Sequence, residues 1–215
     1  MAQTHDEERL ANAPIGPLML KLAVPAVAAQ VINMLYNIVD RIYIGHIPEV
    51  GDIALTGVGV TFPIIMLVSA FAAFAGQGGA PLASIQLGAG DREKAEKILG
   101  NSLTLLLIAA AALTVGFSIF KEPILYAFGA SENTIGYAMD YIGIYLVGTV
   151  FVQLALGLNT FISAQGKALV AMLSVLIGAI LNICLDPVFI FGLNMGVKGA
   201  ALATILSQAV SAAWW

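Results

Sequence analysis

Four polar residues lie in strongly apolar surroundings and together have the chemistry to bind a small cation. Asn182 and Asp186 are four residues apart in the stretch LNICLDPVFIFG, so they share one face of a helix. Asp40 follows the apolar stretch PAVAAQVINMLYNIV, and Thr204 lies within GVKGAALATILSQ. Carboxylate, amide and hydroxyl oxygens suit a hard alkali cation, and a carboxylate also suits a proton. The residue types therefore predict an oxygen-lined cation site.

Two acids that are removed from water have a specific chemistry. A charged residue at the centre of a bilayer costs about 2.5–3.5 kcal/mol on insertion scales, so it usually faces a cavity or a partner and serves a function. Two desolvated carboxyl groups that lie close together can hold a proton at neutral pH and release it when a cation arrives. Pro187 removes a backbone hydrogen bond directly after Asp186, which permits the helix to bend there.

The elements that must position these residues are membrane-spanning helices. Of 215 residues, 60% are hydrophobic and only 10% are charged, against about 25% charged in ordinary soluble domains. The long charge-free intervals match the roughly 20 apolar residues that a spanning helix needs. We therefore expect an all-α polytopic membrane protein with six transmembrane helices. The predicted spans are residues 17–43, 53–80, 97–120, 137–163, 167–191 and 196–215.

Basic residues predict the orientation of these spans. With the N-terminus inside, six Lys and Arg residues fall on the inner side and three on the outer side, which favours both termini inside. The first ten residues are polar and acidic, so we expect no cleavable export signal. Residues 1–16 are expected to form a cytoplasmic segment, and residues 17–215 a single transmembrane lobe.

Helical rise places the polar residues at one depth. Asp186 follows the basic residue at the start of its span by nineteen residues, and Asp40 follows a basic residue in its own span by the same number, about 28 Å along a helix. Thr204 lies six residues, or about 9 Å, into the last span from the outer side. We therefore expect Asp40, Asp186, Thr204 and Asn182 in one layer toward the outer face.

Simpler interpretations of the acids are also open. Asp186 before Pro187 is what we would expect where a helix merely ends near the membrane interface. Asp40 is followed by Arg41, and the two would form an interfacial pair in which the arginine reaches toward water. Asp140 begins its span beside polar loop residues, so the interface is its expected position.

Four polar side chains within the spans have two alternative roles. Asn33 and Tyr36 lie seven and four positions before Asp40 and share its helical face. Each either lines a cavity or hydrogen-bonds a neighbouring helix. The same two alternatives hold for Gln153 and Asn159.

Four stretches of the chain resemble the multidrug and toxic compound extrusion (MATE) family of the MOP flippase superfamily. They are PAVAAQVINMLYNIVDRIYIG (25–45), GAGDREKAEK (88–97), LNICLDPVFIFG (181–192) and GVKGAALATILSQ (196–208). In this order and spacing, they cover essentially the whole chain as the N-terminal lobe of that family. Family members carry two six-helix lobes, about twice the present length.

The resemblance implies a role for each group of residues. The cation site, where a proton or Na⁺ is coupled to bending of the first helix, is implied at Asp40, Asn182, Asp186 and Thr204. The substrate cavity of the N-lobe is implied at Asn33, Tyr36 and Asn159. Pro25 corresponds to the proline of the first helix. No cofactor is expected beyond the coupling ion.

The leading hypothesis is a cation-coupled multidrug efflux antiporter of a bacterial or archaeal cytoplasmic membrane. Lipids, lipophilic or cationic small molecules and a second lobe are its expected partners, and nucleic acid is not. The second lobe would be a missing C-terminal half or the mate in a homodimer. The alternatives are a flippase for lipid-linked sugars and a non-transporting scaffold or truncated half-transporter. No enzymatic activity is expected, because no nucleophile–base pair or metal motif is seen.

Overall fold

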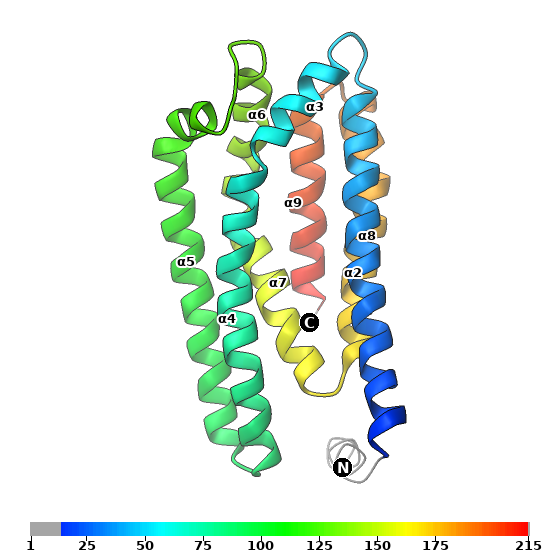
Figure 1. Ribbon diagram of the computed structural model, residues 1–215, viewed down its shortest axis with the longest axis vertical. Helices are drawn as coiled ribbons and strands as arrows, with labels where there is room; N and C mark the ends of the chain where they lie inside the picture. Colours follow the sequence, from blue (N-terminus) through cyan, green and yellow to red (C-terminus); the bar gives the residue numbers. More distant parts are fainter. Residues whose placement is uncertain (1–13, 215) are drawn as a thin grey trace.

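The computed structural model describes residues 14–214, and within this range the regular elements are all helices (Figure 1). The all-α prediction is therefore confirmed. In chain order the elements are α2 (Ile15–Gly45), α3 (Gly51–Val60), α4 (Phe62–Gly88), α5 (Arg92–Ala127), α6 (Ile135–Val147), α7 (Thr149–Ala164), α8 (Ala168–Pro187), the π-helix η1 (Val188–Gly192) and α9 (Val197–Ala213).

Most of the helices in the described residues are long enough to span a membrane, alone or as a bent pair. α2, α4, α5 and the continuous run of α8 and η1 are each long and apolar enough to cross a membrane. α6 and α7 pass the same test together, as one span bent by 60°. α9 has 17 residues and is shorter than the roughly 20 residues of a typical span. The chain is thus a polytopic helical membrane protein, with each predicted span represented by at least one helix.

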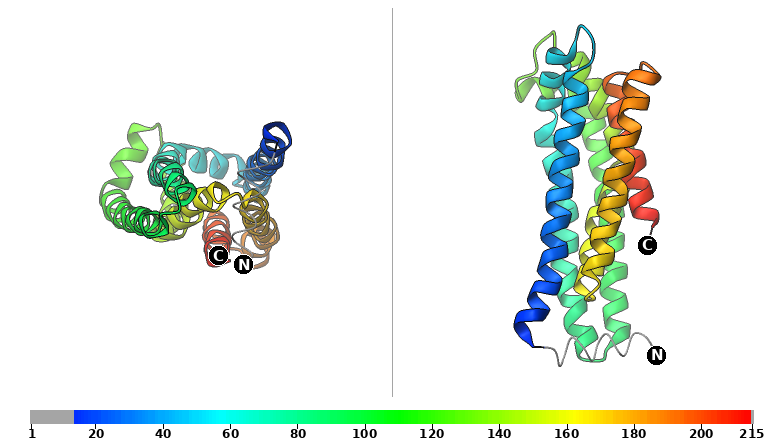
Figure 2. Two further views of the ribbon diagram at one scale, coloured as in Figure 1. Left: turned by 90° about the horizontal axis from the view of Figure 1, so that it is seen from below. Right: turned by 90° about the vertical axis from the view of Figure 1, so that its right-hand side faces the viewer.

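The helices form two packed groups joined in the middle. α4 packs on α5 and α7, while α2 packs along α8. α9 lies between α8 on one side and α6 and α7 on the other, as the end view in Figure 2 shows. α2 therefore depends mainly on α8 for its position.

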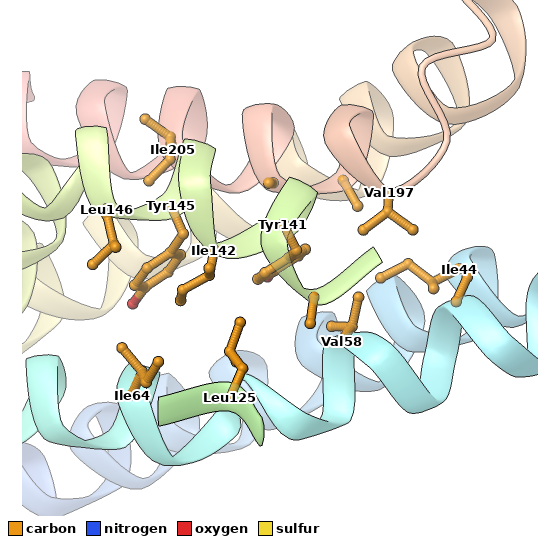
Figure 3. Packing of buried hydrophobic residues seen from close by; sticks show 14 of the residues in the cluster. Ile44, Val58, Ile64, Leu125, Tyr141, Ile142, Tyr145, Leu146, Val197 and Ile205 are labelled. Carbon is orange, nitrogen blue, oxygen red and sulfur yellow. The ribbon is translucent and has the colours of Figure 1, made fainter. Parts of the chain in front are cut away.

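A core of aliphatic and tyrosine side chains fills the end of the bundle at which α2 ends and α9 begins (Figure 3). Its rings include Tyr141 and Tyr145, which stack with centroids 6.3 Å apart. The largest fully buried side chains of this core are Ile44, Ile64, Leu125, Ile142 and Leu146. Close packing of this kind holds α3, α6 and α9 together above the polar residues.

The second predicted span, 53–80, is wrong as a single helix. Thr61 separates α3 from α4, and its hydroxyl donates to the Val58 carbonyl at 2.7 Å. Pro63 has no backbone N–H and suits the first turn of a new helix. α4 alone crosses the bundle and continues through Pro81 to Gly88.

The fourth predicted span, 137–163, is broken by a bend at Gly148 between α6 and α7. A Cβ atom at this position would overlap the side chain of Ile205 on α9. Because Gly148 has no side chain, the bend packs closely against α9. The length of an apolar run predicts the length of a span, but it does not predict this contact.

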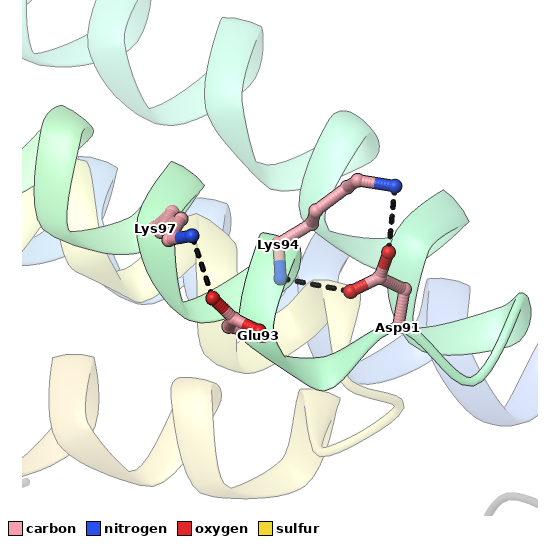
Figure 4. A network of polar contacts seen from close by, with 4 residues as sticks. All are labelled: Asp91, Glu93, Lys94 and Lys97. Carbon is pink, nitrogen blue, oxygen red and sulfur yellow. Dashed lines mark hydrogen bonds and ion pairs between the residues drawn. The ribbon is translucent and has the colours of Figure 1, made fainter.

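The charged segment after α4 begins a helix rather than forming only a connecting loop. Asp91 caps α5, accepting a hydrogen bond from the Lys94 backbone N–H at 3.0 Å, and Lys97 pairs with Glu93 at 2.6 Å (Figure 4). α5 therefore starts at Arg92, five residues before the predicted third span. Residues 1–13 and 215 lie outside the described residues, so the cytoplasmic segment 1–16 stays a prediction.

Candidate cation site and cavity

Asp40 of α2 and Asp186 of α8 face each other across the contact between their helices. Asp40 is 7% exposed and Asp186 is fully buried. Their carboxyl groups are close enough to interact directly. A hydrogen bond between two carboxyl groups requires a proton on one of them, because two ionised carboxylates are both acceptors. Two carboxyl groups this close are able to share a proton.

Asn182 joins the acids to α9. Its side-chain nitrogen donates to Asp186 Oδ1 at 3.3 Å and to Thr204 Oγ1 at 3.4 Å. The Thr204 hydroxyl in turn donates to the Ala200 carbonyl at 3.0 Å. The structure thus brings together the four residues expected in one layer, from α2, α8 and α9.

Three buried oxygen atoms of this cluster have no hydrogen-bond donor when the acids are counted as ionised. They are Asp40 Oδ1, Asn182 Oδ1 and Asp186 Oδ2. Buried polar atoms are normally paired, so unpaired oxygens on neighbouring residues are a candidate site for a small cation. In residues 14–214, no group of three or more His, Cys, Asp or Glu side chains has the arrangement of a metal centre. The groups available to bind an ion are two carboxylates, one amide oxygen and one hydroxyl, and oxygen ligands of this kind fit Na⁺ or a proton.

The orientation of Asn182 bears on the choice between these ions. Its nitrogen points at the acid, as a donor, and its oxygen points elsewhere. This arrangement suits an acid pair that holds a proton. To ligate Na⁺ beside the acids, the amide of Asn182 has to turn so that its oxygen faces the ion.

The charged side chains of Arg41 and Asp140 make direct contacts with residues other than the buried acids. The Arg41 guanidinium lies over the Phe62 ring, 5.4 Å from its centroid, and no ion pair joins it to Asp40 within the described residues. Asp140 pairs with Lys198 at 3.3 Å, and both side chains are about half exposed. Asp140 thus occupies the exposed position that an interfacial residue requires, whereas Asp40 and Asp186 are buried.

A cavity of about 390 Å³ adjoins the acid pair and is bounded by α2, α4, α7, α8 and α9. Asn33, Tyr36 and Asn159, the three residues implied for a substrate cavity, all line it. Asn182 and Thr204 form part of the same wall. The candidate cation site and the cavity therefore share two side chains.

The polar side chains expected either to line a cavity or to hydrogen-bond a neighbouring helix do not all have the same role. Asn159 both lines the cavity and donates to the Ala171 carbonyl at 3.0 Å. Tyr36 lines the cavity and accepts a long hydrogen bond, 3.5 Å, from Gln208 of α9. Gln153 is fully buried and donates to the Val68 carbonyl at 2.8 Å, so it joins α7 to α4.

The two prolines lie in the helices that carry the acids. α2 continues through Pro25, which is partly buried. α8 ends at Pro187, and the winding changes there to the π-helix η1, a feature that often marks functional sites.

Several polar residues of the site were not identified from the sequence. Tyr141 of α6 is buried, and its side chain lies close to Thr204. Gln30, Gln77 and Ser207 line the cavity. A tyrosine or glutamine within an apolar span was the available signal, since such groups need a polar partner when they are buried.

A family model and related proteins both indicate the same protein family for this chain. The family model MatE matches residues 25–188. The multidrug export protein MepA of Staphylococcus haemolyticus is 30% identical over 93% of this chain and 44% of its own length. A FAD transporter of Shewanella oneidensis is 29% identical over 96% of this chain and 46% of its own length.

Solved structures resemble the whole lobe. A crystal structure of MATE in the bent conformation has a TM-score of 0.85 and 31% identity, covering 92% of this chain and 43% of that chain. A crystal structure of MATE in the straight conformation has a TM-score of 0.83 at 31% identity, covering 90% and 42%. The chain thus spans less than half the length of the relatives that it matches.

Proposed function

The chain belongs to the MATE family, and from this premise we propose that it is one lobe of a multidrug antiporter. In this role it exports lipophilic small molecules in exchange for H⁺ or Na⁺. The observation that carries the proposal is the buried pair Asp40 and Asp186 beside a cavity of about 390 Å³. Transport, rather than catalysis, is the activity that this arrangement supports.

The acid pair links the ion to the position of α2. With a proton between Asp40 and Asp186, the carboxyl groups attract each other and hold α2 against α8. Without a proton or another cation, two buried negative charges repel, and burial makes that repulsion strong. Because α2 packs mainly along α8, it is the element that moves. Pro25 and Pro187 lie at positions where a helix bends at lower cost.

The shared wall links the ion to the substrate. Asn182 and Thr204 belong both to the ion cluster and to the cavity. An ion that rearranges these two side chains also changes the surface that a substrate contacts. Coupling between the sites is reciprocal, so substrate must weaken ion binding by the same factor.

A second lobe completes the transporter in this proposal. The relatives are more than twice as long as the region that matches, which supports a partner lobe from the rest of a longer chain or from a second copy. The membrane is proposed to be a bacterial or archaeal cytoplasmic membrane with both ends of the lobe inside, on the basis of the basic residues.

A flippase for lipid-linked sugars fits the cavity less well. Such a substrate carries phosphate groups, which call for Lys or Arg side chains. No Lys or Arg is among the described residues that line the cavity. A scaffold role would not require the two acids to share a proton. Detection of a protonated carboxyl group at the pair therefore distinguishes a transporter from a scaffold.

Infrared difference spectroscopy of the chain in lipid nanodiscs tests the proposal. Spectra recorded between acidic and alkaline buffer should show the carbonyl band of a protonated carboxyl group. We expect this band to disappear in Asp186→Asn and to persist in Asp140→Asn, the matched exposed acid. Loss of the band on addition of NaCl would identify Na⁺ as a competing ion. A band that Asp186→Asn leaves unchanged would contradict the shared proton.

A further inference from the structure

Two glutamines near the middle of their helices have no hydrogen-bond partner within residues 14–214. Gln30 lies fifteen residues from either end of α2, and Gln77 lies fifteen residues after the start of α4. Fifteen residues correspond to about 22 Å of helix, which places both side chains deep in the bilayer. Both are exposed, and neither makes a hydrogen bond within the described residues. At this depth a carboxamide depends on groups inside the cavity for its hydrogen bonds, because hydrocarbon offers none.

Both glutamines line the cavity that adjoins the acid pair. They come from helices that lie apart, with α7 and α9 seen between α2 and α4 in Figure 1. Asn33 follows Gln30 by three residues on α2 and also lines the cavity. Carboxamides from two helices thus border one space.

The cavity wall is polar but uncharged. None of its described lining residues is Asp, Glu, Lys, Arg or His. The acids lie behind Asn182 and Thr204, which occupy the wall. Five lining residues are Ala or Gly, which leaves room for a flat ring: Ala29, Ala73, Ala155, Gly178 and Ala179. The volume of about 390 Å³ falls in the range of pockets for drug-sized molecules.

A carboxamide presents two N–H donors and a carbonyl acceptor in one plane, which complements an amide or imide group. A site with such groups favours ligands that satisfy them, because a ligand without hydrogen-bonding groups leaves them unpaired. We propose that Gln30 and Gln77 clamp a neutral planar group with adjacent carbonyl and N–H groups, and thereby select amide- or imide-bearing substrates over organic cations. This inference rests on the proposed export function and names its substrate class.

The experiment compares two fluorescent probes on the chain in lipid nanodiscs. 4-Aminophthalimide is a neutral imide, and ethidium is a planar organic cation. Gln30→Leu and Gln77→Leu each keep the approximate size of the side chain and remove its hydrogen bonds. We expect each change to lower the affinity for 4-aminophthalimide about tenfold and to leave that for ethidium within about twofold.

Gln86→Leu is the matched control, because Gln86 lies on α4 but does not line the cavity. It should leave both affinities unchanged, and thermal unfolding should show that all three variants fold. Equal losses for both probes, a wild-type preference for ethidium, or no binding of 4-aminophthalimide would each overturn the clamp. The protonated-carboxyl band does not depend on these glutamines. Its presence in the variants would show that only the substrate assignment had failed.

Discussion

The two sides of the bundle are held together by different means. On the α4, α5 and α7 side, helices meet through glycines: a Cβ at Gly76 would lie 2.6 Å from the Gly157 carbonyl oxygen, and one at Gly157 would lie 2.6 Å from Leu106. On the α2, α8 and α9 side, the contacts include buried acids and hydroxyls, and some of their oxygens have no donor. The first side is a close-packed frame, whereas the second side contains the acid pair through which we propose that a cation acts.

The largest effect is expected where the frame is tightest. Gly76→Leu places a side chain against the backbone of α7, which cannot move aside without separating the helices. Overpacking of this kind costs about 3 kcal/mol, enough to remove most of the stability of a marginal domain. Thermal unfolding in detergent, followed by circular dichroism, measures the loss.

Gly78→Leu is the control for this prediction. Gly78 lies on the same helix, and a Cβ there meets nothing within 4 Å. Leucine has a better helix propensity than glycine, so this variant should be as stable as the wild type or slightly more stable. Equal destabilisation by both changes would mean that α4 and α7 are not in the contact described.

The acid pair tests the other side of the comparison. Asp186→Asn imitates an acid that is always neutral, so α2 should stay against α8 whatever the pH. Allosteric coupling is typically 1–3 kcal/mol. The ratio of the substrate affinities at alkaline and acidic pH should therefore fall by roughly 5- to 150-fold in the variant, while the protein still folds. Binding of a lipophilic fluorescent probe in nanodiscs, at acidic and alkaline pH, gives this ratio.

Asp140→Asn removes only a half-exposed ion pair with Lys198, which is worth about 0–1 kcal/mol. Its pH ratio should match that of the wild type. If Asp186→Asn kept the wild-type ratio as well, the acids would be structural and the two sides of the bundle would not differ in function.

A smaller effect on stability is expected at the α8–α9 contact, where one buried serine hydroxyl is hydrogen-bonded and another is not. Ser174 is buried, and its hydroxyl lies 3.1 Å from the Ser211 carbonyl oxygen and 3.0 Å from the Ser211 hydroxyl. Ser174→Ala should cost about 1 kcal/mol. Ser207 is also buried, but its hydroxyl has no partner among residues 14–214, so Ser207→Ala should be neutral or stabilising. Urea titration of the two variants would refute this distinction if both lost the same stability.

The depth of the polar residues was predictable from the sequence, but their partners were not. Helical rise and the four-residue spacing of Asn182 and Asp186 put them in one layer with Asp40 and Thr204, which is how the structure places them. Depth along a helix does not determine which way that helix is turned. Tyr141 was therefore missed, since its contact with Thr204 depends on how α6 packs against α9.

The breaks in the spans were missed for a related reason. Apolar runs reveal how much chain lies in the membrane, because every residue in that region must be apolar or satisfied. The bend at Gly148 depends on the contact with Ile205, which is 57 residues away in the chain and leaves no local pattern. Thr61 and Pro63, by contrast, carry a local helix-start signal within the second span.

The smallest effect concerns an acid on the frame side, at the exposed end of α5. The Lys94 side chain and backbone N–H hydrogen-bond Asp91 and hold the pKa of its carboxyl below the ordinary value of 3.8. Because the folded pKa is the lower one, ionised Asp91 contributes stability above the ordinary pKa, and this contribution is lost as the pH falls through the folded pKa. Asp91→Asn keeps the helix cap but cannot ionise. The melting temperature of the wild type should exceed that of the variant slightly at neutral pH, and the difference should shrink in acid and in high salt. A difference that grew in acid would contradict this sign, because it would mean that the protonated form of Asp91 is the stabilising one.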